Sequence, residues 1–190
     1  MELLQMHIED PVADRAENLV QALKEQKDAI VFEKLYRLYE KKVLAKCWYY
    51  VKDKGEAAEI ADSVWMQVWS KIDQFKSESG FGTWLYRICS NECLNYLKVR
   101  STNALRFSSL DEEDFSEQVS ENERESIERE FDKLDISAAL LKLPKEARAL
   151  VMLKHYDNYT YDEIAAKTGL SASAVKMTIS RAKKKMLQWV

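Results

Sequence analysis

Apolar and polar residues follow one another along the chain with a helical period. Over residues 29–51, apolar side chains recur at intervals of three and four, which is the spacing of one helix face: Phe32, Leu35, Tyr39, Val43 and Cys47. The stretch KDKG at 52–55 then interrupts the pattern. The pattern therefore predicts an amphipathic helix over 29–51 that ends before Lys52.

Two further helices are predicted in the first half of the chain. The helix over 56–72 has an apolar stripe made of Ile60, Val64, Val68 and Ile72, flanked by Ala57, Ala61 and Trp65. Segment 73–81 has serine, glycine and charge but little apolar content, so we expect a loop. In the helix over 82–100, three polar side chains cluster on one face and three others lie opposite. The polar ones are Arg87, Asn91 and Lys98, and those opposite are Leu85, Cys89 and Tyr96.

Helical spacing returns near the C-terminus, over 136–156, where Pro144 suits a first helical turn. Two short helices then flank a glycine. Thr160 and Glu163 form a T-x-x-E capping box, and Gly169 can take a positive φ and end the first helix. Ser171 then caps the second helix. Helix, glycine turn and capped helix together are typical of a helix-turn-helix.

The second of these helices has two unlike faces. Its apolar stripe is Val175, Ile179, Ala182 and Met186. The opposite face holds Ser173, Met177, Ser180 and Lys184, with Lys176 and Arg181 beside it. Short side chains let a helix enter the major groove, and basic side chains neutralise phosphates. The pattern favours DNA binding; the alternative is a helical hairpin with an ordinary charged surface.

Composition agrees with an all-α protein, because only 4 glycines and 2 prolines occur in 190 residues, 32% of which are charged. Charge is unevenly divided. Residues 1–107 carry 16 basic and 16 acidic side chains, 108–136 carry 3 and 12, and 137–190 carry 10 and 4. The chain thus reads as a neutral module, an acidic connector that could not bury enough apolar surface to fold alone, and a basic module. Segment 125–134 is expected to begin a helix.

No apolar run approaches the ~20 residues of a membrane span, and the N-terminal residues lack the pattern of a signal peptide. We therefore expect a cytoplasmic protein without membrane insertion. The odd count of cysteines argues against a disulfide framework. Cys89 and Cys93 share a helix face and could clip a metal, but we interpret them as small, half-buried apolar residues and expect no metal or cofactor.

Aromatic side chains gather around the start of the 82–100 helix: Phe75, Phe81, Trp84 and Tyr86. Rings beside basic and amide groups suit a single-stranded nucleic acid, whose bases stack on them. The alternative is that Trp84 belongs to the core and Arg87 is merely solvated.

Three stretches of the sequence resemble segments of a known protein family. FGTWLYRICSNECLNYLKVR resembles the promoter-melting helix of region 2 in bacterial sigma factors of the extracytoplasmic-function group. EAAEIADSVWMQVWSKI looks like that group's polymerase-binding helix, and LKLPKEARALVMLKHYDNYTYDEIAAKTGLSASAVKMTISRAKKKM resembles its region 4. The matches cover roughly 32–100 and 140–186, in the family's order and separation.

The resemblance implies a factor that binds core RNA polymerase and brings it to promoter DNA. It implies two helical domains with these bounds: an extension over 1–27, region 2 over 28–106, an acidic linker over 107–134 and region 4 over 135–190. The linker would thread toward the polymerase active-site channel, where its charge could mimic RNA. An anti-sigma factor that covers the polymerase-binding faces is a further expected partner.

The resemblance also assigns residues. Those expected to face polymerase are Glu59, Asp62, Ser63, Gln67 and Trp69, although Asp62 and Ser63 stand where Gln-Glu is common in the family. Those expected at the melted minus-ten strand are Lys76, Ser77, Glu78, Ser79, Trp84, Arg87, Asn91, Asn95 and Lys98. Those expected at the minus-thirty-five element are Ser171, Ser173, Ala174, Lys176, Met177, Ser180, Arg181 and Lys184.

Two other functions compete with this one. A helix-turn-helix regulator with an N-terminal sensing or dimerisation domain would explain the C-terminal pattern but leave 75–100 unexplained. An enzyme would need a metal-ligand cluster, a glycine-rich phosphate loop or a Ser-His-Asp set, and the sequence shows none of these motifs. We therefore expect a protein that is not an enzyme.

Overall fold

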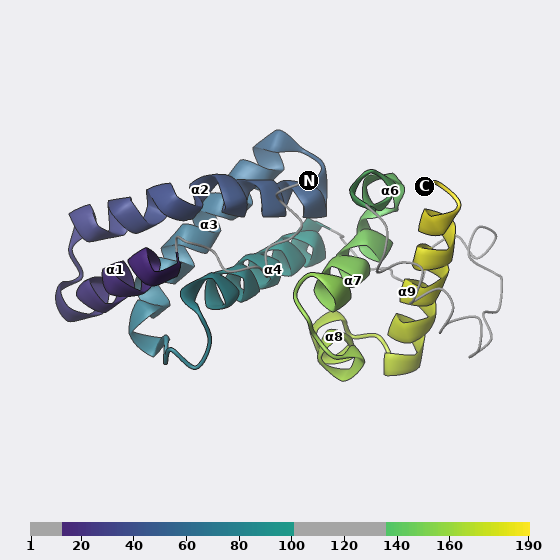
Figure 1. Ribbon diagram of the computed structural model, residues 1–190. Helices are drawn as coiled ribbons and strands as arrows, with labels where there is room; N and C mark the ends of the chain where they lie inside the picture. The colour runs from purple at the N-terminus through teal and green to yellow at the C-terminus, as the bar shows by residue number, and fades with distance from the viewer. Residues whose placement is uncertain (1–12, 101–135) are drawn as a thin grey trace. The chain divides into compact units, whose positions relative to one another are not determined.

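A computed structural model of the chain describes residues 13–100 and 136–190, and within them the regular structure is helical (Figure 1). The all-α prediction is confirmed for these residues. The chain divides into two compact units between Tyr96 and Leu97, and each is described by itself. The expected linker at 107–134, the helix start in 125–134 and the domain bounds near 106 and 134 lie outside the described residues.

The first unit contains α1 (Ala13–Gln26), α2 (Ala29–Val51), α3 (Lys54–Lys71), a 3-10 turn η1 (Ile72–Gln74) and most of α4 (Phe81–Arg100). The stripes predicted for α2 and α3 are buried, apart from Phe32, which is half-buried. The loop predicted over 73–81 is shorter than expected, because η1 extends through Gln74 and α4 begins at Phe81.

The break between α2 and α3 is also shorter than the KDKG stretch. Lys52 takes a left-handed conformation with φ 59°, and its N–H donates to the Trp48 carbonyl at 2.7 Å. Asp53 then accepts from the Glu56 N–H at 2.9 Å, so α3 begins at Lys54 and contains Gly55. The turn is made by two residues, because a left-handed C-cap is followed directly by an N-cap.

Helix α1 lies in the segment that the sequence indicated only as an extension. It packs on α2 and η1 and buries Ala16, Val20 and Leu23, whose spacing of four and three is a helical signal. Its last turn also contacts the segment before α4. Lys24 donates to the Phe75 carbonyl at 2.9 Å, and Lys27, just beyond α1, pairs with Asp73 at 2.7 Å. The helix therefore supports the base of the following loop.

The second unit contains α6 (Ser137–Lys142), α7 (Lys145–His155), α8 (Tyr161–Thr168) and α9 (Ala172–Leu187). Helix α7 is buried on all sides from Ala147 through Leu153, including the charged Arg148. This is more than the single apolar face that the sequence indicated. Pro144 precedes α7 as its N-cap residue rather than entering its first turn.

The caps predicted for α8 and α9 are confirmed. The Glu163 N–H donates to the Thr160 hydroxyl at 3.2 Å, and the Thr160 N–H donates to the Glu163 carboxylate at 2.7 Å. Gly169 has φ 80° and ends α8, and Ser171 accepts from the Ala174 N–H at 3.1 Å to begin α9. These local bonds fix the turn of the helix-turn-helix. Among the described helices, none has a stretch long and apolar enough to cross a membrane.

Candidate nucleic-acid interface

An exposed loop at Lys76–Gly80 joins η1 to α4 in the first unit. All four loop residues expected at the melted strand, Lys76, Ser77, Glu78 and Ser79, are exposed, and Ser77 has a positive φ of 58°. The loop is bounded by buried Phe75 and Phe81. Because its ends are anchored in the core and its tip is exposed, the loop can present its polar groups to a ligand.

Trp84 belongs in part to the core, and its role in stacking on a nucleic acid stays a prediction. Its ring lies 5.3 Å from the Phe75 ring and 5.8 Å from the Phe81 ring, between centroids, so it belongs to an aromatic cluster. It is nevertheless only half-buried, unlike its two neighbours. A ring that packs against other rings on one side and is accessible on the other is suitable for stacking with a base. Its side chain is already ordered, so little conformational entropy is lost on binding.

A polar row continues from Trp84 along α4. Arg87, Asn95 and Lys98 are exposed and Asn91 is half-buried, whereas Leu85 and Cys89 are fully buried. The expected residues recur at intervals of three and four, so they share one face of α4. The row and the loop together hold every residue expected at the minus-ten strand.

The face expected to contact polymerase is presented by α3. Glu59 and Asp62 are exposed, and Ser63, Gln67 and Trp69 are half-buried. The Trp69 ring meets the Phe32 ring of α2 edge-on at 5.0 Å between centroids. Burial, then the nearby carboxylates of Glu40 and Asp62, raise the pKa of the Tyr36 hydroxyl, so this α2 side chain stays protonated beside α3.

Sequence reasoning missed Met66 on this face. Its side chain is 66% exposed, one turn beyond Asp62 and Ser63 and one turn before Trp69. A single exposed apolar residue is common on protein surfaces, but its position between the expected contact residues makes it a candidate contact as well. Its spacing of three or four residues from Asp62, Ser63 and Trp69 was the signal in the sequence that could have identified it.

In the second unit, α9 exposes its N-terminal end. Ser171 and Ser173 are exposed, and Ala174, Lys176, Met177, Arg181 and Lys184 are half-buried. The buried stripe Val175, Ile179, Ala182 and Met186 is confirmed.

The outward position predicted for Ser180 is wrong. Ser180 is 7% exposed, and its hydroxyl is buried without a hydrogen-bond partner in the part of the chain that the structure describes. The reason is that α9 contacts three helices, α6, α7 and α8, so its buried sector is wider than one stripe. Lys183 is buried for the same reason. We therefore remove Ser180 from the base-reading set.

Positive charge also lies inside the second unit. Burial, together with the charges of Lys183 and Lys154, lowers the pKa of His155 to about 3, so this histidine is neutral at physiological pH. Burial lowers the pKa of Arg148 to about 10, against the effect of Glu146, and Arg148 donates to the Leu143 carbonyl at 3.1 Å. Arg148 remains charged at neutral pH.

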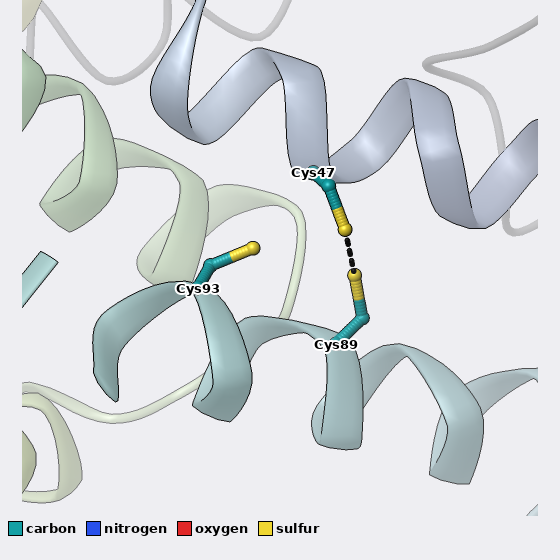
Figure 2. Close-up of side chains that lie close together, drawn as sticks. All are labelled: Cys47, Cys89 and Cys93. Carbon is teal, nitrogen blue, oxygen red and sulfur yellow. Dashed lines mark hydrogen bonds between the residues drawn. The ribbon is translucent and has the colours of Figure 1, made fainter. Parts of the chain in front are cut away.

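Among the described residues, the group suited to hold a metal is formed by Cys47, Cys89 and Cys93 (Figure 2). All three are fully buried, not half-buried as the sequence suggested. The sequence could pair Cys89 with Cys93 because they are one turn apart. It gave no signal that Cys47, from a different helix, would join them.

Comparison with known proteins gives two family matches. Residues 35–102 match the model of sigma-70 region 2, and residues 133–186 match the model of sigma-70 region 4. The chain is 27% identical over 162 residues to the RNA polymerase sigma-H factor of Pseudomonas aeruginosa, covering 82% of this chain and 84% of the relative. It is 26% identical over 163 residues to the ECF RNA polymerase sigma-E factor of Escherichia coli K12, with the same two coverages.

Comparison with solved structures also gives matches. CnrH, in complex with the cytosolic domain of CnrY, covers 92% of this chain and 96% of its own, with 20% identity and a TM-score of 0.48. The sigma factor RpoE in complex with the anti-sigma factor NepR, from Bartonella quintana, covers 83% and 94%, again with 20% identity and a TM-score of 0.48.

Proposed function

Because the chain belongs to the sigma-70 family, we propose that it is a sigma factor of the extracytoplasmic-function group that binds core RNA polymerase and directs it to promoters. The observation that carries this proposal is the presence of region 2 and region 4, in that order, in one chain. The family is one of transcription initiation factors, so the chain's place of action would be the cytoplasm, with the polymerase.

Polymerase binding is assigned to the α3 face. Glu59 and Asp62 supply exposed carboxylates, and Met66 with the half-buried Trp69 supplies apolar area next to them. Interfaces commonly combine an apolar, aromatic centre with a charged rim, and this face has both. Ser63 and Gln67 complete it. Ser63 donates to the Glu59 carbonyl at 3.2 Å, which leaves its oxygen able to accept from a partner.

Promoter melting is assigned to the loop 76–80 and the polar row of α4. Removing a base from a duplex costs a few kcal/mol, and stacking on an aromatic ring offsets about 1–3 kcal/mol per base. Trp84 supplies the ring. Lys76 supplies positive charge in the loop, as Arg87 and Lys98 do along α4, for the phosphates of the separated strand.

Recognition of the minus-thirty-five element is assigned to α9. Its N-terminal end, with Ser171, Ser173 and Ala174, would enter the major groove, where short side chains allow close approach to base edges. Lys176 and Met177 would follow along the groove. Arg181 and Lys184, further along the helix, would contact phosphates. Replacement of Ser173 or Lys176 should therefore change which sequence is preferred.

Two further proposals concern the acidic linker and an anti-sigma factor as regulatory partner. We infer that the acidic segment 107–134 threads toward the active-site channel of polymerase, because its charge resembles that of RNA. We also infer control by an anti-sigma factor that covers the α3 face, as is common in the group that the chain resembles. Affinity capture from unstressed cells should then return such a partner, and capture of polymerase subunits alone would contradict this part.

The experiment that tests the function is reconstitution of holoenzyme. Purified chain and core RNA polymerase should co-elute from a sizing column and initiate transcription on a subset of a promoter library. Asp62→Lys should weaken co-elution, whereas Glu17→Lys, the same charge reversal at an exposed position of α1, should not. If wild-type chain and core polymerase elute separately, the regulator alternative is favoured and the proposal fails.

A further inference from the structure

Three cysteines that the proposed function does not use meet in the core of the first unit. Cys47 comes from α2, and Cys89 and Cys93 come from successive turns of α4 (Figure 2). Each is 0% exposed. The Sγ atoms of Cys47 and Cys89 are 3.4 Å apart, and all three sulfurs lie within 4.8 Å of one another. They are the only cysteines of the chain.

The spacing of the three sulfurs matches that of a common metal ligand set. Thiolate sulfurs bind zinc at about 2.3 Å, so three sulfurs placed evenly around one ion are about 4 Å apart. The Cys47–Cys89 separation is 3.4 Å and no separation exceeds 4.8 Å, which is compatible with this value. Small side-chain rotations would therefore bring three sulfurs onto one ion, without a change of backbone.

The surroundings of the cluster act on its three thiols in opposite directions. Hydrogen bonds from Cys89 and then Cys93, helped by the charge of Lys46, hold the pKa of Cys47 below its ordinary value. Burial raises the pKa of Cys89 and of Cys93. Because the thiolate is the metal ligand, an ion that binds here would release the protons held by the thiols to solvent.

Besides the metal ion itself, the side chain of Lys46 supplies a positive charge that could offset the charge of three thiolates. Lys46 is 7% exposed, and its ammonium lies 5.4 Å from the centroid of the Tyr86 ring of α4. Three thiolates carry one net negative charge around Zn(II) and two around Cu(I), and the positive charge of Lys46 offsets one of them.

We propose that Cys47, Cys89 and Cys93 form a binding site for one thiophilic metal ion, held by three sulfur ligands inside the first unit. Soft sulfur ligands select Cu(I) or Zn(II) over hard cations. The described residues offer no fourth cysteine, histidine or carboxylate in this group, which suits Cu(I), since zinc is almost always four-coordinate in structural sites. The ion would join α2 to α4 and stabilise the unit.

The test uses the full chain, reduced and freed of metal under anaerobic conditions. Cu(I) and Zn(II) are titrated separately, and native mass spectrometry counts the ions bound. We expect one ion per chain, a thiolate-to-metal absorption band in the ultraviolet, and protection of all three thiols from alkylation. The midpoint of thermal unfolding should also rise. Whichever ion meets these criteria identifies the metal.

Substitution of the cysteines tests whether the ion binds at this site. Cys47→Ser and Cys93→Ser should each lose one-to-one binding and the absorption band. Val43→Ala, which opens the same core one turn from Cys47 and leaves every thiol in place, should keep both. Circular dichroism shows which variants remain helical. If a serine variant does not fold, X-ray absorption on the wild-type complex decides, since three sulfur neighbours at about 2.3 Å are expected.

Three results would overturn the proposal. The first is the absence of one-to-one binding of either ion by the wild-type chain. The second is binding that survives in folded Cys47→Ser and Cys93→Ser chains. The third is fewer than three sulfur neighbours in the X-ray absorption of the bound ion. A Cys47–Cys89 disulfide that forms with peroxide in a chain unable to bind metal would belong to the first case and indicate a redox role instead.

Discussion

The two helical units bury different kinds of side chain. The first has many aromatic residues in its core, such as Tyr39, Tyr50, Trp65, Phe75 and Phe81. The second relies on small and aliphatic residues, with Ala139, Ala147, Ala149 and Ala182 fully or nearly buried, and it also encloses Arg148 and Lys183. Aromatic packing leaves rings such as Trp84 at the edge of the first core, whereas small residues let α9 lie against three helices.

The units also differ in charge. Residues 1–107 are neutral overall, while residues 137–190 carry 10 basic and 4 acidic side chains. The difference suggests two ways to hold DNA. On the proposed function, the first unit would offer a ring and a loop to separated bases, and the second would offer a basic helix to an intact duplex.

The largest expected effect concerns the independence of the two cores. Leu150→Ala removes a fully buried side chain from α7 and should destabilise the second unit by about 2–5 kcal/mol. Hydrogen exchange should show lost protection over 136–190 with 13–96 unchanged. Leu35→Ala, in α2, should give the reverse pattern. Equal loss in both units from either variant would mean that they unfold as one.

Trp84→Ala should remove the stacking platform of the first unit. Loss of about 1–3 kcal/mol of base stacking predicts roughly a 5- to 150-fold decrease in open-complex formation. Binding of double-stranded promoter DNA should change little. Permanganate footprinting of the melted region measures the effect. Trp48→Ala, at another half-buried tryptophan of the same unit, is the control for general destabilisation and should leave melting intact.

Low pH should lower the stability of the second unit because of His155. Its pKa in the fold is about 3, below the ordinary 6.5, so above pH 6.5 both folded and unfolded chains are neutral there. Below pH 6.5 the unfolded chain binds a proton that the folded chain does not, so stability is lost as the pH falls from 6.5 toward 3. At pH 5.5 the loss is about 1 kcal/mol.

His155→Gln should remove this part of the pH dependence. Urea unfolding at pH 7.5 and 5.5, followed by hydrogen exchange over 136–190, compares the variant with the wild type. The change in the free energy of unfolding between the two pH values should be smaller in the variant by about 1 kcal/mol. An unchanged difference would show that His155 titrates normally in the folded chain.

The smallest effect is expected from a single phosphate contact. Arg181→Ala should weaken binding to a responsive promoter a few-fold and reduce the slope of log affinity against log salt by about 1. Fluorescence anisotropy at several salt concentrations measures both. Ser180→Ala, at the neighbouring buried position, should change neither the slope nor the preferred sequence. A changed preference in that variant would return Ser180 to the base-reading face.

The local features of this protein could be predicted from its amino-acid sequence alone. The Thr160–Glu163 box, the Gly169 turn and the Ser171 cap depend on bonds between residues at most four apart, so their spacing was enough to predict them. The apolar stripe of α3 was equally clear, since period alone places Ile60, Val64 and Val68 inside. The family resemblance came from the same short stretches.

Features that depend on the packing of one helix against another could not be predicted in this way. Ser180 is buried because three helices surround α9, and a helical wheel, which shows one helix alone, cannot count its neighbours. Cys47 joins Cys89 and Cys93 across 42 and 46 positions of sequence because α2 and α4 share a core. Periodicity determines which face of a helix is apolar, but packing determines how wide that face is and what it meets.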